Sequence, residues 1–88
     1  MKIKDGFMLR EIAGSWMVVP IGERVVEFNG LMVLSESGAV LWNKLVKGDD
    51  IEGLAMTLSE EYDIDQTTAR TDVESFVSMV AERGLFEE

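Results

Sequence analysis

The sequence predicts a single α+β domain in which three strands precede three helices. Two observations lead to this prediction. The first third of the chain consists of short β-favouring runs separated by turn residues, whereas the rest repeats apolar side chains at helical spacing. A length of 88 residues fits one domain with one modest core, so we expect residues 1–88 to form one unit.

Two runs near the N-terminus predict a β-hairpin. Residues Phe7 to Gly14 alternate weakly between the two faces of a strand. Residues Ser15 to Pro20 favour a strand that stops at a proline, which cannot donate to a ladder. The expected turn is Ala13-Gly14-Ser15. Trp16 in the second strand fits either the core or a partner-facing position.

The next segment, from Ile21 to Phe28, is ambiguous. Gly22 favours a turn, and Val25-Val26 suits either a strand or a short loop element. Asn29-Gly30 then signals a turn or a bulge.

A third strand is expected from Leu31 to Leu34, where all side chains are apolar. Strands alternate faces, so Leu31 and Val33 point one way while Met32 and Leu34 point the other, and both faces are apolar. Either helices or a loop cover both faces, or one face and one edge stay available. An available edge could take up an extended peptide by β-augmentation.

Polar residues mark the starts of the three expected helices. The candidate N-caps are Ser35 or Ser37, then Asp49-Asp50, then Asp65. Gly48 is expected to stop the first helix after Lys47, and Gly84 is expected to follow a third helix running from about Gln66 to Arg83, with Leu85 folding back as its hydrophobic partner.

Apolar stripes then predict which helix faces are buried. The first helix offers Leu41, Trp42 and Leu45, the second Ile51, Leu54, Ala55, Leu58 and Tyr62, and the third Ala69, Val73, Phe76, Val77 and Val80. Core packing is therefore the expected role of Trp42. Gly38 is interpreted as a small residue that lets the first helix pack closely.

Composition argues against an enzyme. The chain has no cysteine and no histidine, which removes disulfides, thiolate metal sites, the commonest general base and the usual nucleophile–base pairs. No catalytic or dinucleotide-binding motif is present, and no cofactor is expected. The acidic residues Glu60, Glu61, Asp63 and Asp65 could hold a cation, but they lack the pattern of a calcium loop and better fit a solvated helix end and an N-cap.

The net charge of −9 lies entirely in the C-terminal part of the chain. Residues 1–34 balance four basic against four acidic side chains, while residues 35–88 carry four basic and 13 acidic ones. Such a surface disfavours nucleic acid and anionic membranes as partners. The N-terminus lacks the apolar region of a signal peptide and no apolar run could span a bilayer, so a cytoplasmic protein is expected.

Several short motifs, taken in order, resemble those of a known family. They are FNGLxxLSESGAxxWxxL from Phe28 to Leu45, EEYDID from Glu60 to Asp65, Asp72-Val73, and Gly84-Leu85-Phe86. Their order and spacing resemble the PqqD-like family, named for pyrroloquinoline quinone biosynthesis protein D. The family's central run typically reads LNETGAxxW. Here Ser35 and Ser37 replace its Asn and Thr, and both can still cap a helix.

The resemblance, which covers almost the whole chain, implies a winged helix-turn-helix-like fold with a three-stranded antiparallel sheet followed by three helices. It also implies a non-catalytic peptide chaperone, or recognition element, for ribosomally made and modified peptides. In this family the leader of the precursor peptide adds as a strand beside the third strand and packs on the third helix. The domain then presents the peptide to a modifying enzyme, often a radical S-adenosylmethionine enzyme.

Carried onto this sequence, the resemblance gives a candidate peptide-binding set. The third strand supplies Leu31, Met32, Val33 and Leu34. Our choice on the third helix is the stripe Asp72, Phe76, Met79 and Arg83, at i, i+4, i+7 and i+11, with Ser75 beside it. Phe76 fits an ordinary core position equally well, because Val73, Val77 and Val80 surround it.

Two other functions remain as alternatives. A winged-helix DNA-binding regulator would share the fold class, but the third helix carries Arg70 and Arg83 against three acidic residues and is a poor match for DNA. A structural subunit of a larger complex is the second alternative. An open edge strand also permits strand exchange between two copies, so a homodimer is compatible with the sequence.

Overall fold

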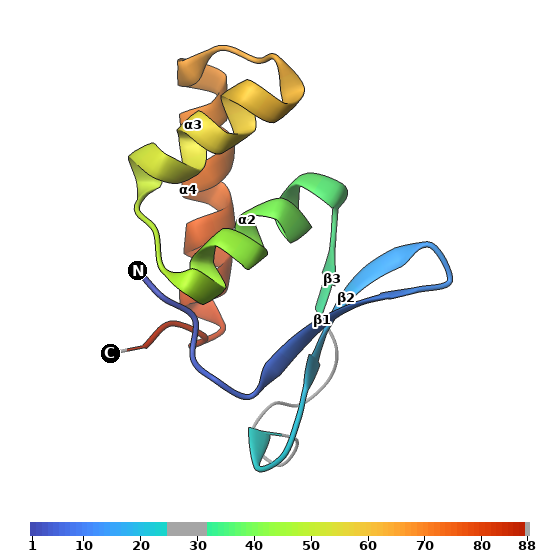
Figure 1. Cartoon of the computed structure of the whole chain (residues 1–88). Helices are drawn as coiled ribbons and strands as arrows, with labels where there is room; N and C mark the ends of the chain where they lie inside the picture. Colours follow the sequence, from blue (N-terminus) through green and yellow to red (C-terminus); the bar gives the residue numbers. More distant parts are fainter. Residues whose placement is uncertain (25–31, 88) are drawn as a thin grey trace.

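The computed structural model describes residues 1–24 and 32–87, and its three-stranded antiparallel sheet followed by three helices confirms the predicted α+β class (Figure 1). The elements are β1 (Phe7–Ile12), β2 (Ser15–Pro20), β3 (Met32–Leu34), α2 (Glu36–Lys47), α3 (Ile51–Tyr62) and α4 (Gln66–Glu82). The winged helix-turn-helix-like description fits this order. The features expected at Val25-Val26, Asn29-Gly30 and Leu31 lie outside the described residues.

Strands β1 and β2 form the predicted hairpin through a two-residue turn. Ile12 pairs with Ser15, and the turn residues Ala13 and Gly14 both have positive φ, at 52° and 82°. A turn with two such residues matches the twist of the flanking strands. Glycine adopts this conformation without steric cost, whereas an alanine there is uncommon.

Each helix begins at a cap that the sequence predicted. The side-chain oxygens of Ser35, Asp50 and Asp65 each accept a hydrogen bond from the backbone N–H three residues later, at 3.1, 2.8 and 2.7 Å. Each bond satisfies a donor that the first helical turn leaves without a partner. Within residues 1–24 and 32–87, no helix combines the length and apolarity needed to cross a membrane.

The C-terminal end of α4 is a Schellman motif, as the Gly84-Leu85 pair predicted. Gly84 has φ +70°, its N–H donates to the Ala81 carbonyl at 3.0 Å, and the Leu85 N–H donates to the Val80 carbonyl at 3.3 Å. These two bonds satisfy terminal carbonyls of the helix. The Leu85 side chain folds back into the core, with 2% of its surface exposed.

The core lies between the sheet and the helices and uses the predicted stripes. Its buried members are Ile3, Val18, Met32, Leu34, Leu41, Trp42, Leu45, Leu54, Ala55, Leu58, Ala69, Val73, Val80 and Leu85. Trp42 is 1% exposed, which confirms its core role. Its ring meets Phe7 of β1 edge-to-face, with centroids 6.4 Å apart, and such a contact links α2 to the sheet.

The two ends of the described chain meet beside the last turns of α2 and α4, an arrangement the sequence did not predict. The Ile3 N–H donates to the Leu45 carbonyl at 3.0 Å, and the Lys4 N–H donates to the Leu85 carbonyl at 2.8 Å. Ile3 also forms an isolated bridge with Phe86, and Figure 1 shows the two ends on the same side of the molecule. These contacts join the two helix ends through a buried Ile3.

Candidate functional site

The strand β3 forms one edge of the sheet. The strand order is β1-β2-β3, so β3 pairs with β2 on one side only among the described strands. The paired residues are Trp16 with Leu34, Met17 with Val33, and Val18 with Met32. An edge strand presents backbone N–H and C=O groups that can pair with a further strand.

The hairpin turn determines where the backbone amides of β2 point. Residues that flank a two-residue turn form a hydrogen-bonded pair, and hydrogen-bonded and non-bonded pairs then alternate along the ladder. Ile12 and Ser15 are the flanking pair, so the odd-numbered residues of β2 direct their amides to β1. The Ile21 N–H donates to the Gly6 carbonyl at 2.8 Å, in phase with this alternation. The even-numbered residues of β2 therefore direct their amides to β3.

The same alternation places the backbone of Val33 on the free edge. Met32 and Leu34 are paired with the even-numbered residues Val18 and Trp16. Their backbone N–H and C=O groups are therefore directed to β2 for hydrogen bonding. Val33 lies between them and directs both its N–H and its C=O away from β2. Among the described residues of β3, Val33 thus presents a donor and an acceptor to an added strand.

The side chains of β3 point to two different environments. Met32 and Leu34 are 3% and 6% exposed and belong to the core, whereas Val33 is 62% exposed on the outer face of the sheet. This result decides which residues of the predicted strand face the core. Leu31, the remaining strand residue of the candidate set, lies outside the described residues.

The start of α2 connects the end of β3 to α4. A side-chain carbon added at Gly38 would lie 3.3 Å from Cε1 of Phe76 and 3.4 Å from Cβ of Leu34. Gly38 therefore allows α2 to pack closely, as interpreted from the sequence, and both Leu34 and Phe76 lie next to it. Sequence spacing alone gave no signal that these two residues converge.

The predicted stripe on α4 divides into two groups. Phe76 and Met79 are half-buried and pack against the core, whereas Asp72, Ser75 and Arg83 are exposed. Ser75 and Met79 line a shallow surface hollow with Thr71, Glu74, Ser78 and Glu82. Phe76 thus combines a core contact with partial exposure.

A second hollow lies where β3 ends, and the sequence did not identify it. Its volume is about 450 Å³, and it is lined by Glu11, Gly14, Ser15, Trp16, Leu34, Ser35 and Glu36. Trp16 is half-buried and packs against the core while lining this hollow. Trp16 therefore lies between the core and a surface hollow.

Two groups near the helix ends have altered proton affinity. Burial, together with the negative charges of Glu36 and Glu61, raises the pKa of Tyr62. Hydrogen bonding to Thr68, first through the backbone N–H, lowers the pKa of Asp65. Asp65 thus acts as a helix cap, and no group of carboxylates among the described residues could hold a metal ion.

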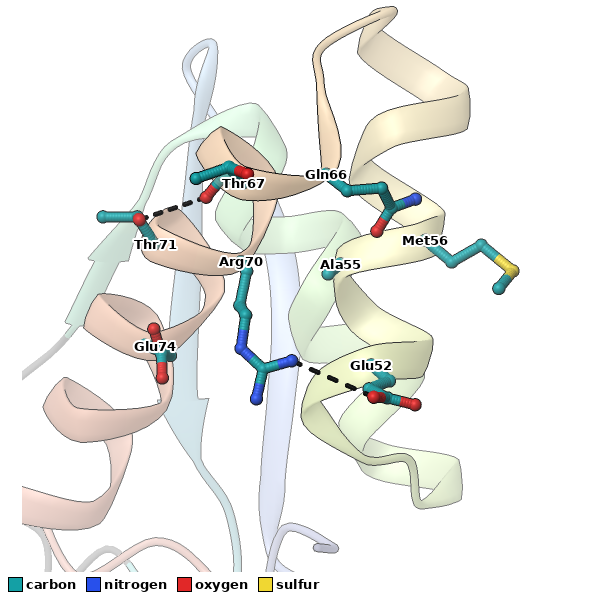
Figure 2. Close-up of a pocket in the computed structure, with 8 residues that line it drawn as sticks. All are labelled: Glu52, Ala55, Met56, Gln66, Thr67, Arg70, Thr71 and Glu74. Carbon is teal, nitrogen blue, oxygen red and sulfur yellow. Dashed lines mark hydrogen bonds and ion pairs between the residues drawn. The ribbon is translucent and has the colours of Figure 1, made fainter.

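A third hollow lies between α3 and α4, and both polar and apolar side chains line it. Its volume is about 500 Å³, and it is lined by Glu52, Ala55, Met56, Gln66, Thr67, Arg70, Thr71 and Glu74. Figure 2 shows Glu52 and Arg70 pointing toward one another across it, 4.0 Å apart, while Met56 projects away from α4. The Thr71 hydroxyl donates to the Thr67 carbonyl at 3.1 Å, so it serves the helix backbone.

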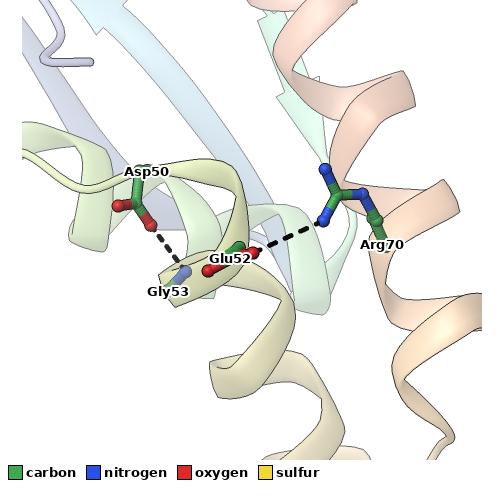
Figure 3. A network of polar contacts seen from close by, with 4 residues as sticks. All are labelled: Asp50, Glu52, Gly53 and Arg70. Atoms are coloured by element: carbon green, nitrogen blue, oxygen red, sulfur yellow. Dashed lines mark hydrogen bonds and ion pairs between the residues drawn. The ribbon is translucent and has the colours of Figure 1, made fainter.

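The polar contacts at the start of α3 have a structural role. Asp50 caps the helix through the Gly53 N–H, and the adjacent Glu52 pairs with Arg70 of α4 (Figure 3). Both side chains of the ion pair are more than half exposed, so it contributes little to stability.

Comparison with known proteins identifies a family. The family model described as "Coenzyme PQQ synthesis protein D (PqqD)" matches residues 16–85. A search of the curated proteins found no significant match.

Two solved structures share the fold. The structure described as "TbiB1 in Complex with the TbiA(beta) Leader Peptide" has a TM-score of 0.77 and 23% identity, over 99% of this chain and 95% of that one. The structure described as "Lasso peptide synthetase B1 complexed with the leader peptide" has a TM-score of 0.73 and 18% identity, over 96% of this chain and 93% of that one. At these identities the likeness concerns the fold.

Proposed function

The chain belongs to the PqqD family, and we propose on this premise that it is a non-catalytic peptide chaperone. It binds the leader of a ribosomally made precursor peptide and presents it to a modifying enzyme. The two proteins of similar fold were both solved with a leader peptide, which supports this function. We assign residues 1–88 to one peptide-recognition domain.

The observation that carries the proposal is the free edge of β3. Val33 directs its N–H and C=O outward, and an extended peptide can pair with both. Each such hydrogen bond contributes about 0.5–1.5 kcal/mol net. Because backbone pairing is independent of side chains, this edge gives affinity and the neighbouring surfaces give selectivity.

The α4 surface would supply that selectivity. Side chains of the added strand on the Leu34 side would meet the start of α2 and the accessible parts of Phe76 and Met79. The exposed residues Asp72, Ser75 and Arg83 would form a polar rim. Met32 and Leu34 shape the site from within the core and are not themselves accessible.

We further propose that the modifying enzyme is of the radical S-adenosylmethionine type and that the pair works in the cytoplasm, where ribosomally made peptides arise. Catalysis and cofactors would belong to that enzyme. The unpaired edge of β3 also supports a homodimer formed by strand exchange. Such a dimer would compete with the peptide for the same backbone groups.

Amide-resolved NMR titration tests the peptide-binding function. The probe is the precursor peptide encoded beside this chain's gene, and the expected shifts fall on β3 and along α4. The amides of β1, at the opposite edge, are the internal reference and should stay unchanged. Shifts confined to β1 or to α3, or no binding of the peptide, would contradict the proposal.

A parallel titration with duplex DNA separates this function from that of a DNA-binding regulator. The net charge of −9 predicts no binding at physiological salt. Saturable binding of the duplex would favour the regulator instead.

A further inference from the structure

The sheet has an outer face directed away from the three helices. Alternation along the paired strands places seven described residues on it, namely Met8, Arg10, Ile12, Ser15, Met17, Val19 and Val33. Figure 1 shows α2, α3 and α4 gathered on the other side of the strands. Ile12 and Val33 are 44% and 62% exposed, and Met17 and Val19 are not part of the core cluster.

The outer face differs in charge from the rest of the molecule. Its one charged member is Arg10, whose Nε lies 3.2 Å from the Met8 sulfur. Among the described residues, Arg10 forms no ion pair. A mainly apolar surface with a single cation is thus presented by a chain whose net charge is −9. Such a surface is complementary to an apolar patch that carries a carboxylate.

The outer face is also continuous with the peptide edge. Val33 contributes its side chain to the outer face and its backbone to the free edge of β3. A strand added at this edge would place alternate side chains on the same side as Val33. The bound leader would therefore extend the outer face by one strand.

We propose that this outer face is the docking surface for the modifying enzyme, which meets it with an apolar patch and a carboxylate opposite Arg10. The inference rests on the proposed function and adds the place where the partner binds. Because a bound leader extends the surface, the enzyme binds the peptide-loaded domain more tightly than the empty one. Recognition of the enzyme is thereby coupled to possession of the peptide.

A second copy of this chain is a less favourable occupant. Arg10 lies midway along β1, paired with Met17 of β2. In a two-fold arrangement the same patch meets itself, so two guanidinium groups would be brought toward each other without a carboxylate between them. An enzyme surface has no such restriction.

The test measures two affinities for each variant by isothermal titration calorimetry. The probes are the leader peptide and the purified modifying enzyme encoded beside this chain's gene. The outer-face variants are Ile12→Lys and Arg10→Glu, both on β1 and away from the peptide edge. The matched control is Met56→Lys, which changes an apolar side chain that is 54% exposed on α3.

We expect both outer-face variants to lower the affinity for the enzyme by about tenfold and to leave leader binding unchanged. Met56→Lys should leave both affinities unchanged, and saturating leader should tighten enzyme binding to the wild-type chain. The inference is overturned if the outer-face variants bind the enzyme normally, if Met56→Lys has the same effect, or if the leader does not tighten binding. A dimer seen by analytical ultracentrifugation and abolished by Ile12→Lys would assign the face to a second copy. If the wild-type chain did not bind the leader peptide at all, that result would instead contradict the proposed function.

Discussion

The two edges of the sheet offer the same backbone chemistry in different surroundings. At the β1 edge, residues such as Glu11 direct their amides outward, as Val33 does at the β3 edge. The β1 edge is the longer one, with six residues against the three described for β3. Yet it is β3 that leads into the first turn of α2, where a side-chain carbon added at Gly38 would lie 3.3 Å from the Phe76 ring of α4.

The difference shows that an open edge is not by itself a specific site. Backbone groups at either edge can pair with any extended chain. What distinguishes β3 is a neighbouring helix with partly accessible apolar side chains, which can recognise the side chains of an added strand. The predictions below test this distinction by changing one edge at a time.

The largest effect is expected from Phe76→Ala. Removal of a half-buried ring should lower the free energy of unfolding by about 2 kcal/mol, less than for a fully buried phenylalanine. It should also lower leader affinity by about tenfold, as for a central contact residue. Phe7→Ala at the β1 edge is the matched control, since that ring is also half-buried. Denaturant unfolding and peptide titration should show similar destabilisation but a loss of affinity for Phe76→Ala alone.

A smaller effect is expected from Val33→Pro. The proline removes an amide donor that faces the free edge, so it spares the pairing with β2 and is tolerated at an edge position. Leader affinity should fall by about fivefold, which corresponds to about 1 kcal/mol for one hydrogen bond. Glu11→Pro makes the same change at the β1 edge and should leave affinity unchanged. Equal losses for the two variants would show that the edges are equivalent.

A still smaller effect is expected from Gly38→Ala. The new methyl group would lie 3.3 Å from the Phe76 ring and displace it slightly, while the helix would gain up to about 1 kcal/mol in intrinsic propensity. Stability should therefore change little, and leader affinity should fall by only about twofold to threefold. Gly53→Ala, whose methyl group would meet the movable Asp49 side chain, is the control. An unchanged affinity for Gly38→Ala would indicate that the position of Phe76 is not critical.

The smallest effect concerns Asp65, which is remote from both edges of the sheet. Its pKa in the folded chain is lowered by the hydrogen bond from the Thr68 N–H, so the ionised carboxylate stabilises the fold above the unfolded-state pKa. This contribution is lost as the pH falls through the folded-state pKa. Asp65→Asn keeps a capping side chain without the titration, so its unfolding midpoint should vary less with pH in the acid range. Leader affinity at neutral pH should be the same for the wild-type chain and for Asp65→Asn. A difference in affinity would indicate that the start of α4 contributes to the peptide-binding site.

Local patterns in the sequence predicted most of the fold. Ser35, Asp50 and Asp65 were recognisable as caps because a cap bonds to a backbone group only three residues away. Gly84 and Leu85 marked the end of α4 for the same reason. The buried stripes of all three helices followed from their spacing.

The candidate site was predictable only in part. The family resemblance pointed to β3 and α4, but which β3 side chains face the core followed from the paired sheet. The roles of Phe76 and Trp16 also stayed open, because each side chain turns out to be divided between core and surface.

The sequence by itself determined the order of the described elements and the apolar faces of the helices, because these depend on interactions within a few residues along the chain. Only the tertiary structure decided that the Val33 backbone faces a free edge, since this depends on the phase set by a hairpin turn some 20 residues earlier. It also decided that Leu34 and Phe76 both lie next to Gly38, and that Ile3 is buried between the ends of α2 and α4. Contacts between distant segments depend on how whole elements pack together, and no local pattern records that arrangement.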